Sequence, residues 1–350
     1  MKEKYIATLV GCAVGDSLGM AVEGWKREQI IKYVGRVETL LDPVIPIDKD
    51  GNEIKEDEFG KIKTHTRNNK KGDFTDDTIL TLVIADSIID QGKIDLEDIA
   101  RKHLDAYKIR LKEDGSVIGG FGGTTIDALK NLQKGVSYLE SGVIWGPGNA
   151  PAMKMHPVGM YMHATNNYDN GLRDAENISK ITHLDPRSIV SGVLQAHAVY
   201  SLLNGIGRKE FLESLVELCD KNEKPLDERF KWHNSGSLGS RINWINENKD
   251  AENFEAFETL GNSSAVYKSY PFSIFMFQKY WDNPMKGLIE TINYGGDCDT
   301  TGAIYGALAG AKNGMIFPEE IVNGINEIDR IKNVGERIFE LSNKLVGERK

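Results

Sequence analysis

Apolar residues recur along most of this 350-residue chain at intervals of three and four positions. This spacing places them on one face of an α-helix, whereas the alternating pattern of β-strands is scarce. The chain is therefore expected to be all-α, without a repeat of solenoid length. Helices are predicted over residues 4–22, 76–90, 95–111, 126–134, 186–204, 209–219, 271–281, 285–293, 299–313 and 318–346.

Three of these helices have an unusual composition. Residues 76–90 are apolar on nearly all sides, which predicts a helix buried in the core. Within residues 4–22 a glycine follows every four positions, at Gly11, Gly15 and Gly19. Glycine lowers helix stability unless close packing offsets the loss, so this bare face favours a tight helix crossing. Residues 299–313 carry a second bare face of the same spacing.

Two segments, about 33–72 and 220–262, are polar and resemble insertions within one domain that spans residues 1–350. The first segment carries a loose basic cluster, for which a solvated loop is favoured over a lid that faces phosphate. The cluster consists of Lys61, Lys63, His65, Arg67, Lys70 and Lys71.

Composition is ordinary for a globular protein, at 40% hydrophobic and 27% charged residues. A net charge of −9 argues against a general nucleic-acid or anionic-membrane surface. The cysteines, Cys12, Cys219 and Cys298, show no paired spacing, which suits a reducing compartment. Because Asp16 soon interrupts the apolar N-terminal run, neither a signal peptide nor a membrane span is expected, and the predicted location is cytoplasmic.

Two acidic motifs, GDFTDDT at 72–78 and GGDCDTTG at 295–302, each precede an apolar helix. Thr75 or Asp76 is a natural N-cap for the first helix, yet a cap requires only one acid. If the two helix N-termini converge, four carboxylates repel one another unless cations neutralise them. Oxygen ligands favour Mg²⁺ or Mn²⁺, and no Cys/His spacing typical of zinc is present. The four acids are Asp76, Asp77, Asp297 and Asp299.

Other polar residues have simpler interpretations. Asp16, on the glycine-striped helix, is expected to serve as a buried hydrogen-bonding group, and Glu23 by itself is typical of a surface glutamate. Cys298 is interpreted as a packing residue, because no neighbouring histidine would activate it as a nucleophile. Ser269 and Tyr270 are expected to line the pocket.

Five motifs, in this order, resemble the motifs of the ADP-ribosylglycohydrolase family, which includes the ADP-ribosylhydrolases and the dinitrogenase-reductase-activating glycohydrolases. The resemblance extends from about Ile6 to Ala311, and the paired acidic motifs are its most specific part. The motifs are GCAVGDSLGMAVEG, GDFTDDT, GNAPAMKMHPVG, ITHLDP and INYGGDCDTTGAIYGALAGA.

The resemblance implies a compact, orthogonal all-α fold around a binuclear Mg²⁺ or Mn²⁺ centre. It implies catalytic roles for Glu23, as a mobile acid, and for Asp76 and Asp297. It assigns the metal ligands as Thr75, Asp76, Asp77, Asp297, Asp299 and Thr300. It places ADP-ribose across loops 119–125 and 146–154. The substrate-binding residues it implies are Gly120, Phe121, Gly122, Trp145, Gly148, Asn149, Met153 and His183.

Three departures from the family pattern bear on the substrate. Lys154 stands where the family commonly has arginine, and it lacks the planar two-pronged donor of that side chain. Ala150 replaces a glycine, and Pro147 replaces an aromatic residue that would stack on adenine, a role that Trp145 or Phe121 can take.

The expected function is hydrolysis of the glycosidic bond between ADP-ribose and an acceptor, which reverses ADP-ribosylation. The expected partners are an ADP-ribosylated protein or a small ADP-ribosyl conjugate, while the linkage that is cut stays open. An alternative is a non-catalytic protein of the same fold that binds ADP-ribose or a nucleotide. Two-metal hydrolysis of a phosphoester is a third reading and would release phosphate instead of ADP-ribose.

Overall fold

The computed structural model describes residues 1–63, 69–226, 228–230 and 236–348. Within these ranges the only sheet is an antiparallel hairpin of β1 (Glu56–Asp57) and β2 (Gly60–Lys61), so the predicted all-α class is confirmed. The helices are α1 (Lys2–Met20), α2 (Arg27–Tyr33), α3 (Asp76–Gln91), α4 (Leu96–Arg110), α5 (Gly123–Gln133), α6 (Ala150–Lys154), α7 (His156–Thr165), α8 (Tyr168–Lys180), α9 (Pro186–Leu203), α10 (Arg208–Asn222), the 3₁₀ helix Glu228–Phe230, α11 (Leu238–Glu247), α12 (Asn253–Leu260), α13 (Val266–Lys279), α14 (Pro284–Ile292), α15 (Cys298–Asn313), α16 (Glu319–Asn323) and α17 (Ile328–Glu348).

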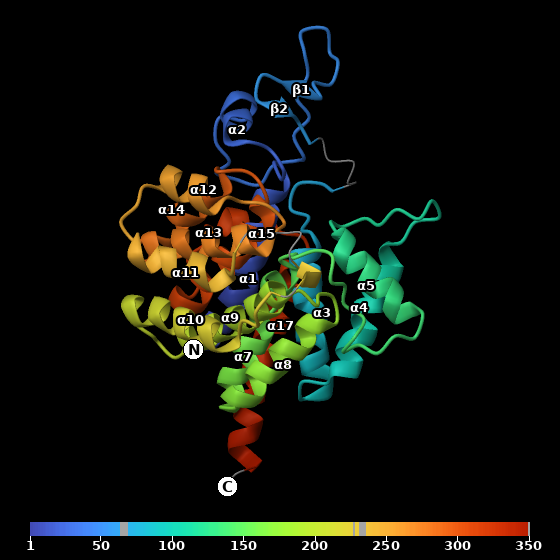
Figure 1. The fold of residues 1–350 in the computed structure, drawn as a ribbon, viewed down its shortest axis with the longest axis vertical. Coiled ribbons are helices and arrows are strands. Elements are labelled where there is room, and N and C mark those ends of the chain that lie inside the picture. The colour runs from blue at the N-terminus through green and yellow to red at the C-terminus, as the bar shows by residue number, and fades with distance from the viewer. Residues whose placement is uncertain (64–68, 227, 231–235, 349–350) are drawn as a thin grey trace.

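The two glycine-striped helices, α1 and α15, pack directly against each other in antiparallel directions near the centre of the molecule (Figure 1). A Cβ atom on Gly15 would lie 1.9 Å from the carbonyl oxygen of Gly302. One on Gly11 would lie 2.1 Å from the oxygen of Gly306. Since no side chain fits, the helix backbones touch, and the N-terminus of α15 lies beside the C-terminal half of α1.

The N-terminus of α3 is held at the same place by Asp16 of α1. The buried carboxylate of Asp16 accepts hydrogen bonds from the backbone N–H of Thr75, at 3.0 Å, and of Thr78, at 3.1 Å. It also accepts the Thr78 hydroxyl at 2.7 Å. This confirms the predicted hydrogen-bonding role of Asp16, which ties the first acidic motif to α1.

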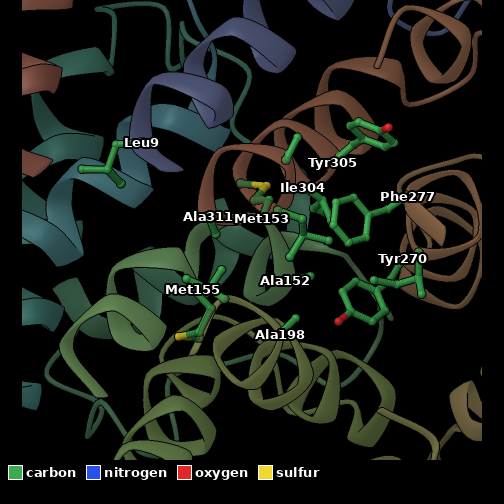
Figure 2. Close-up of a cluster of buried hydrophobic side chains, with 14 of the residues drawn as sticks. Leu9, Ala152, Met153, Met155, Ala198, Tyr270, Phe277, Ile304, Tyr305 and Ala311 are labelled. Carbon is green, nitrogen blue, oxygen red and sulfur yellow. The ribbon is translucent and has the colours of Figure 1, made fainter. Parts of the chain in front are cut away.

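The short helix α6 is packed into the core between α3, α9 and α15. Figure 2 shows Ala152 and Met153 of α6 in the same apolar cluster as Ile304 and Tyr305 of α15 and Ala198 of α9. Since α6 is fixed on these sides, the loop that precedes it has a defined position.

The described part of the polar segment 33–72 packs against the helices and is partly buried. Asn293, at the end of α14, donates its amide N–H to the Val37 carbonyl at 2.9 Å and accepts the Val37 N–H at 2.8 Å. The Trp25 indole donates to the Lys63 carbonyl at 2.9 Å. Figure 1 shows α2 and the β1–β2 hairpin together at one end of the molecule, above α12 and α15.

Several helix predictions require correction. Helix α13 begins at Val266, five residues before the predicted start, and Pro271 lies inside it. Core packing of Val266 and Tyr270, which are fully buried, outweighs the helix-breaking tendency of the proline. The predicted helix 318–346 is two helices, because Glu327 adopts a positive φ of 56° between α16 and α17.

Other helices were not predicted. They are α2, most of α7, α8, and the α11 and α12 pair within the polar segment 220–262. Helix α8 is polar overall and buries mainly small residues, such as Gly171, Ala175 and Ser179, so it offers few of the large apolar side chains that mark a helix in a sequence. None of the described helices combines the length and apolar character needed to cross a membrane.

Candidate metal centre and ligand cavity

A cavity of about 610 Å³ lies where the N-termini of α3 and α15 meet the loops that precede α5 and α6. The predicted substrate-binding residues all line it: Gly120, Phe121, Gly122, Trp145, Gly148, Asn149, Met153 and His183. The carboxylates that line it are Glu23, Asp76, Asp77, Asp297 and Asp299.

The acids form two groups that share one member. Carboxylate oxygens of Asp16, Asp77 and Asp299 lie within 4.8 Å of one another, and so do those of Glu23, Asp297 and Asp299. Asp299 therefore stands between two positions, each of which offers three carboxylates. The sequence did not indicate that Asp16 joins one group, whereas Asp76 lines the cavity outside both groups.

The two threonines of the predicted ligand set lie against Asp77. Thr75 is the N-cap of α3, as predicted, and its hydroxyl donates to Oδ2 of Asp77 at 2.9 Å. The Thr300 hydroxyl reaches the same oxygen at 3.4 Å. The other oxygen of Asp77, Oδ1, is buried and has no hydrogen-bond partner among the described residues. A buried oxygen without a donor fits a bound cation.

The pKa values of the clustered carboxyl groups also favour a bound cation. Burial, followed by repulsion from Asp16, Asp76 and Asp297, raises the pKa of Asp77 well above its usual range. Burial and the charge of Glu23 raise the pKa of Asp297 to about 6. The cluster is therefore unfavourable when fully ionised and unneutralised. The oxygen-only donor set fits hard divalent cations such as Mg²⁺ and Mn²⁺.

Asn149 connects the acidic end of the cavity to the loop before α6. Its side-chain amide donates to Oδ2 of Asp297 at 2.6 Å and to the Ser269 hydroxyl at 3.0 Å. The prediction that Ser269 and Tyr270 line the pocket is wrong. Ser269 contacts the Asn149 side chain from outside the cavity, while Tyr270 of α13 is fully buried in the core.

His183 contacts both of the glycine-containing loops that line the cavity, residues 119–125 and 146–154. Its Nε2 lies 3.0 Å from the Thr124 hydroxyl, a cavity residue that the motifs did not single out. A Cβ atom on Gly148 would lie 2.4 Å from the same nitrogen, so this loop approaches only because residue 148 is glycine. Burial lowers the pKa of His183 to about 3, which keeps its ring neutral.

Two lysines differ from the sequence-based expectation. Lys63 of the basic cluster lines the cavity, and its ammonium lies 2.5 Å from Oε1 of Glu23, so this residue is more than part of a solvated loop. His65 and Arg67 of the same cluster lie outside the described residues. Lys154 does not line the cavity, because it is fully buried and bonds to His103 at 3.2 Å and Thr182 at 3.1 Å.

Comparison with known proteins identifies chains of similar sequence and fold. The family model described as ADP-ribosylglycohydrolase matches residues 1–348. An uncharacterized protein of Archaeoglobus fulgidus is 28% identical, with 99% of each chain covered. The ADP-ribosylhydrolase ARH3 of Mus musculus is 26% identical over 97% of this chain and 92% of that protein. A solved structure titled ADP-ribosylglycohydrolase-related protein complex has a similar fold, with a TM-score of 0.66 and 21% identity. That match covers 97% of this chain and 98% of the other.

Proposed function

The chain belongs to the ADP-ribosylglycohydrolase family, and from this premise we propose that it is a hydrolase dependent on two divalent cations. It cleaves the glycosidic bond between ADP-ribose and a modified acceptor. The acceptor belongs to an ADP-ribosylated protein or a small ADP-ribosyl conjugate. The observation that carries the proposal is the pair of acid groups sharing Asp299 at one end of the ligand cavity. We also propose a cytoplasmic location, because the three cysteines are free, as is typical of proteins in a reducing compartment.

The cations would be held by Asp76, Asp77, Asp297 and Asp299, with the hydroxyls of Thr75 and Thr300. Asp16, within reach of Asp77 and Asp299, supports this set from α1. When bound, the cations would neutralise the carboxylates, bind ribose hydroxyls and act as Lewis acids toward water.

Acidic side chains of the protein transfer protons and stabilise positive charge near the anomeric carbon. We assign proton transfer to Asp297, whose carboxylate belongs to the same acid group as Glu23 and Asp299. Asn149 holds Oδ2 of Asp297 in place. Glu23 belongs to the same acid group, and its negative charge stabilises a sugar ring with oxocarbenium character.

The opposite part of the cavity provides the binding surface for ADP-ribose. Backbone N–H groups of the loops around Gly122 and Gly148 approach a pyrophosphate without hindrance from side chains. Trp145, which is 42% exposed at the cavity, and Phe121 offer ring faces for adenine. His183 keeps the two loops in register through Thr124.

The test is a panel of ADP-ribosylated substrates, on arginine, on serine and on small molecules, with released ADP-ribose as the readout. We expect release in Mg²⁺ or Mn²⁺, loss of release in EDTA, and recovery when the cation returns. Asp77→Asn keeps the shape of the side chain but removes its charge, so both turnover and Mn²⁺ affinity should fall at least about tenfold.

The matched control is Asp127→Ala, which removes a carboxylate that is 46% exposed on α5, and it should retain wild-type turnover. Full activity in excess EDTA would contradict the role of the cations. Calorimetric binding of ADP-ribose without release from any linkage would support the non-catalytic binder instead. Release of phosphate in place of ADP-ribose would indicate phosphoester hydrolysis.

A further inference from the structure

Lys63 introduces a positive charge at the acid end of the cavity. Its backbone carbonyl accepts the Trp25 indole N–H at 2.9 Å, and Trp25 is almost fully buried, so the segment is anchored. Its aliphatic stem crosses Gly24, where a Cβ atom would lie 2.6 Å from Cδ of the lysine. Its ammonium ends 2.5 Å from Oε1 of Glu23.

This charge is distinctive within the cavity. Among the described residues that line it, Lys63 is the only lysine or arginine, and five acidic residues line the same cavity. The ammonium lies at the acid group of Glu23, Asp297 and Asp299, and its charge acts on Asp297 as well. Lys63 therefore faces the place where the glycosidic bond would be broken and the acceptor would leave.

Taking the proposed function as the premise, we infer that Lys63 determines acceptor specificity. It disfavours cationic acceptors, such as the guanidinium of arginine, and favours uncharged acceptors linked through oxygen, such as the hydroxyl of serine.

The physical argument rests on Glu23. A guanidinium beside the scissile bond would bind a free carboxylate through paired hydrogen bonds. Lys63 already donates to Oε1 of Glu23, so a guanidinium has to displace it and then lie next to a like charge. Juxtaposition of like charges opposes binding, and solvent reduces the effect here because the Lys63 side chain is 49% exposed.

An oxygen-linked acceptor experiences the opposite effect. Hydrolysis breaks the bond between the anomeric carbon and the acceptor oxygen and joins that carbon to the oxygen of water. One proton passes from the water to the acceptor oxygen, so no further reactant is required. Negative charge develops on the acceptor oxygen as the bond breaks, and a nearby ammonium stabilises it.

The experiment compares kcat/KM for serine-linked and arginine-linked ADP-ribose on peptides of the same net charge, at low and high ionic strength. The wild type should prefer the serine linkage, and Lys63→Met should narrow this preference by about tenfold. Salt should narrow the wild-type preference, because it screens the charge of Lys63, but should not narrow that of Lys63→Met, where only carboxylates remain to be screened. Lys63→Arg should keep the wild-type preference.

The matched control is Lys61→Met, which removes an exposed lysine two residues away that does not line the cavity, and it should preserve the wild-type ratio. The inference alone is overturned if ADP-ribose is released but Lys63→Met leaves the preference unchanged. It is also overturned if the wild type prefers the arginine linkage. Absence of release from both substrates would instead overturn the proposed function.

Discussion

Individual residues in this protein bury charge in two different ways. The carboxylates of Asp77 and Asp299 are buried and that of Asp297 is half-buried, all beside one cavity, an arrangement that cations can relieve. Lys154 is buried with neutral partners only, the ring of His103 and the hydroxyl of Thr182. Burial therefore lowers the pKa of Lys154 from 10.5 to about 7. The first arrangement suits a ligand, whereas the second costs stability near neutral pH.

The burial of Lys154 among neutral partners should make the stability of the protein depend on pH. Between pH 10.5 and about 7 the unfolded chain binds a proton at Lys154 that the folded protein does not. The group therefore destabilises the fold as pH falls through this range, by about 1.4 kcal/mol per pH unit. Lys154→Met should gain stability relative to the wild type with this slope, as measured by urea unfolding at several pH values from about 9 to 7.

The control for this comparison is Lys108→Met, which replaces an exposed lysine on α4 and should show no such slope. A stability difference for Lys154→Met that stays constant across the pH range would mean that the pKa of Lys154 is not lowered in the folded protein.

At the level of secondary-structure elements, the crossing of α1 and α15 positions the acids. Gly15 and Gly302 bring the two backbones into contact, and the antiparallel direction places Asp299 beside the end of α1 that carries Asp16. Asp16 in turn holds the first turn of α3 through Thr75 and Thr78. One helix thus fixes the position of both acidic motifs, so the geometry of the acid groups depends on how closely the helices approach.

Adding one methyl group at the helix crossing should test whether the acid groups depend on the close approach of α1 and α15. Gly15→Ala would place its Cβ 1.9 Å from the Gly302 carbonyl oxygen, so the helices must separate. We expect a loss of at least about 3 kcal/mol in the free energy of unfolding. Mn²⁺ affinity should fall in parallel, because Asp16 and Asp299 move apart.

The control is Gly123→Ala in the first turn of α5, where the nearest atom, on Trp145, lies 3.4 Å from the added Cβ. This variant should lie within about 1 kcal/mol of the wild type, since alanine favours helix and meets ordinary contact. Equal stability of Gly15→Ala and the wild type would contradict the close crossing.

For the whole molecule, we propose one domain that spans residues 1–350 and is built around the cation site. The acids come from α1, α3 and α15 and from the turns beside them, and α1 packs against both α15 and α17. A ligand bound among these elements stabilises all of them at once, because it binds the folded state and not the unfolded chain.

Thermal unfolding should therefore show one transition that Mn²⁺ or Mg²⁺ raises and EDTA returns to its starting value. A cation at one hundred times its dissociation constant adds about 2.7 kcal/mol per site. Scanning calorimetry with and without cation measures the shift. Two separate transitions, of which the cation moves only one, would contradict the single domain.

The sequence by itself determined the helical class, most helix positions and the two acidic motifs on which the proposed cation site rests. These are local properties, because apolar periodicity, an N-cap such as Thr75 and a bare glycine face depend on neighbours along the chain. Tertiary structure alone decided that Asp16 joins Asp77 and Asp299, that Lys63 meets Glu23, and that Lys154 turns away from the cavity. Those outcomes depend on distances between segments far apart in sequence, which packing of whole helices sets and no local pattern encodes.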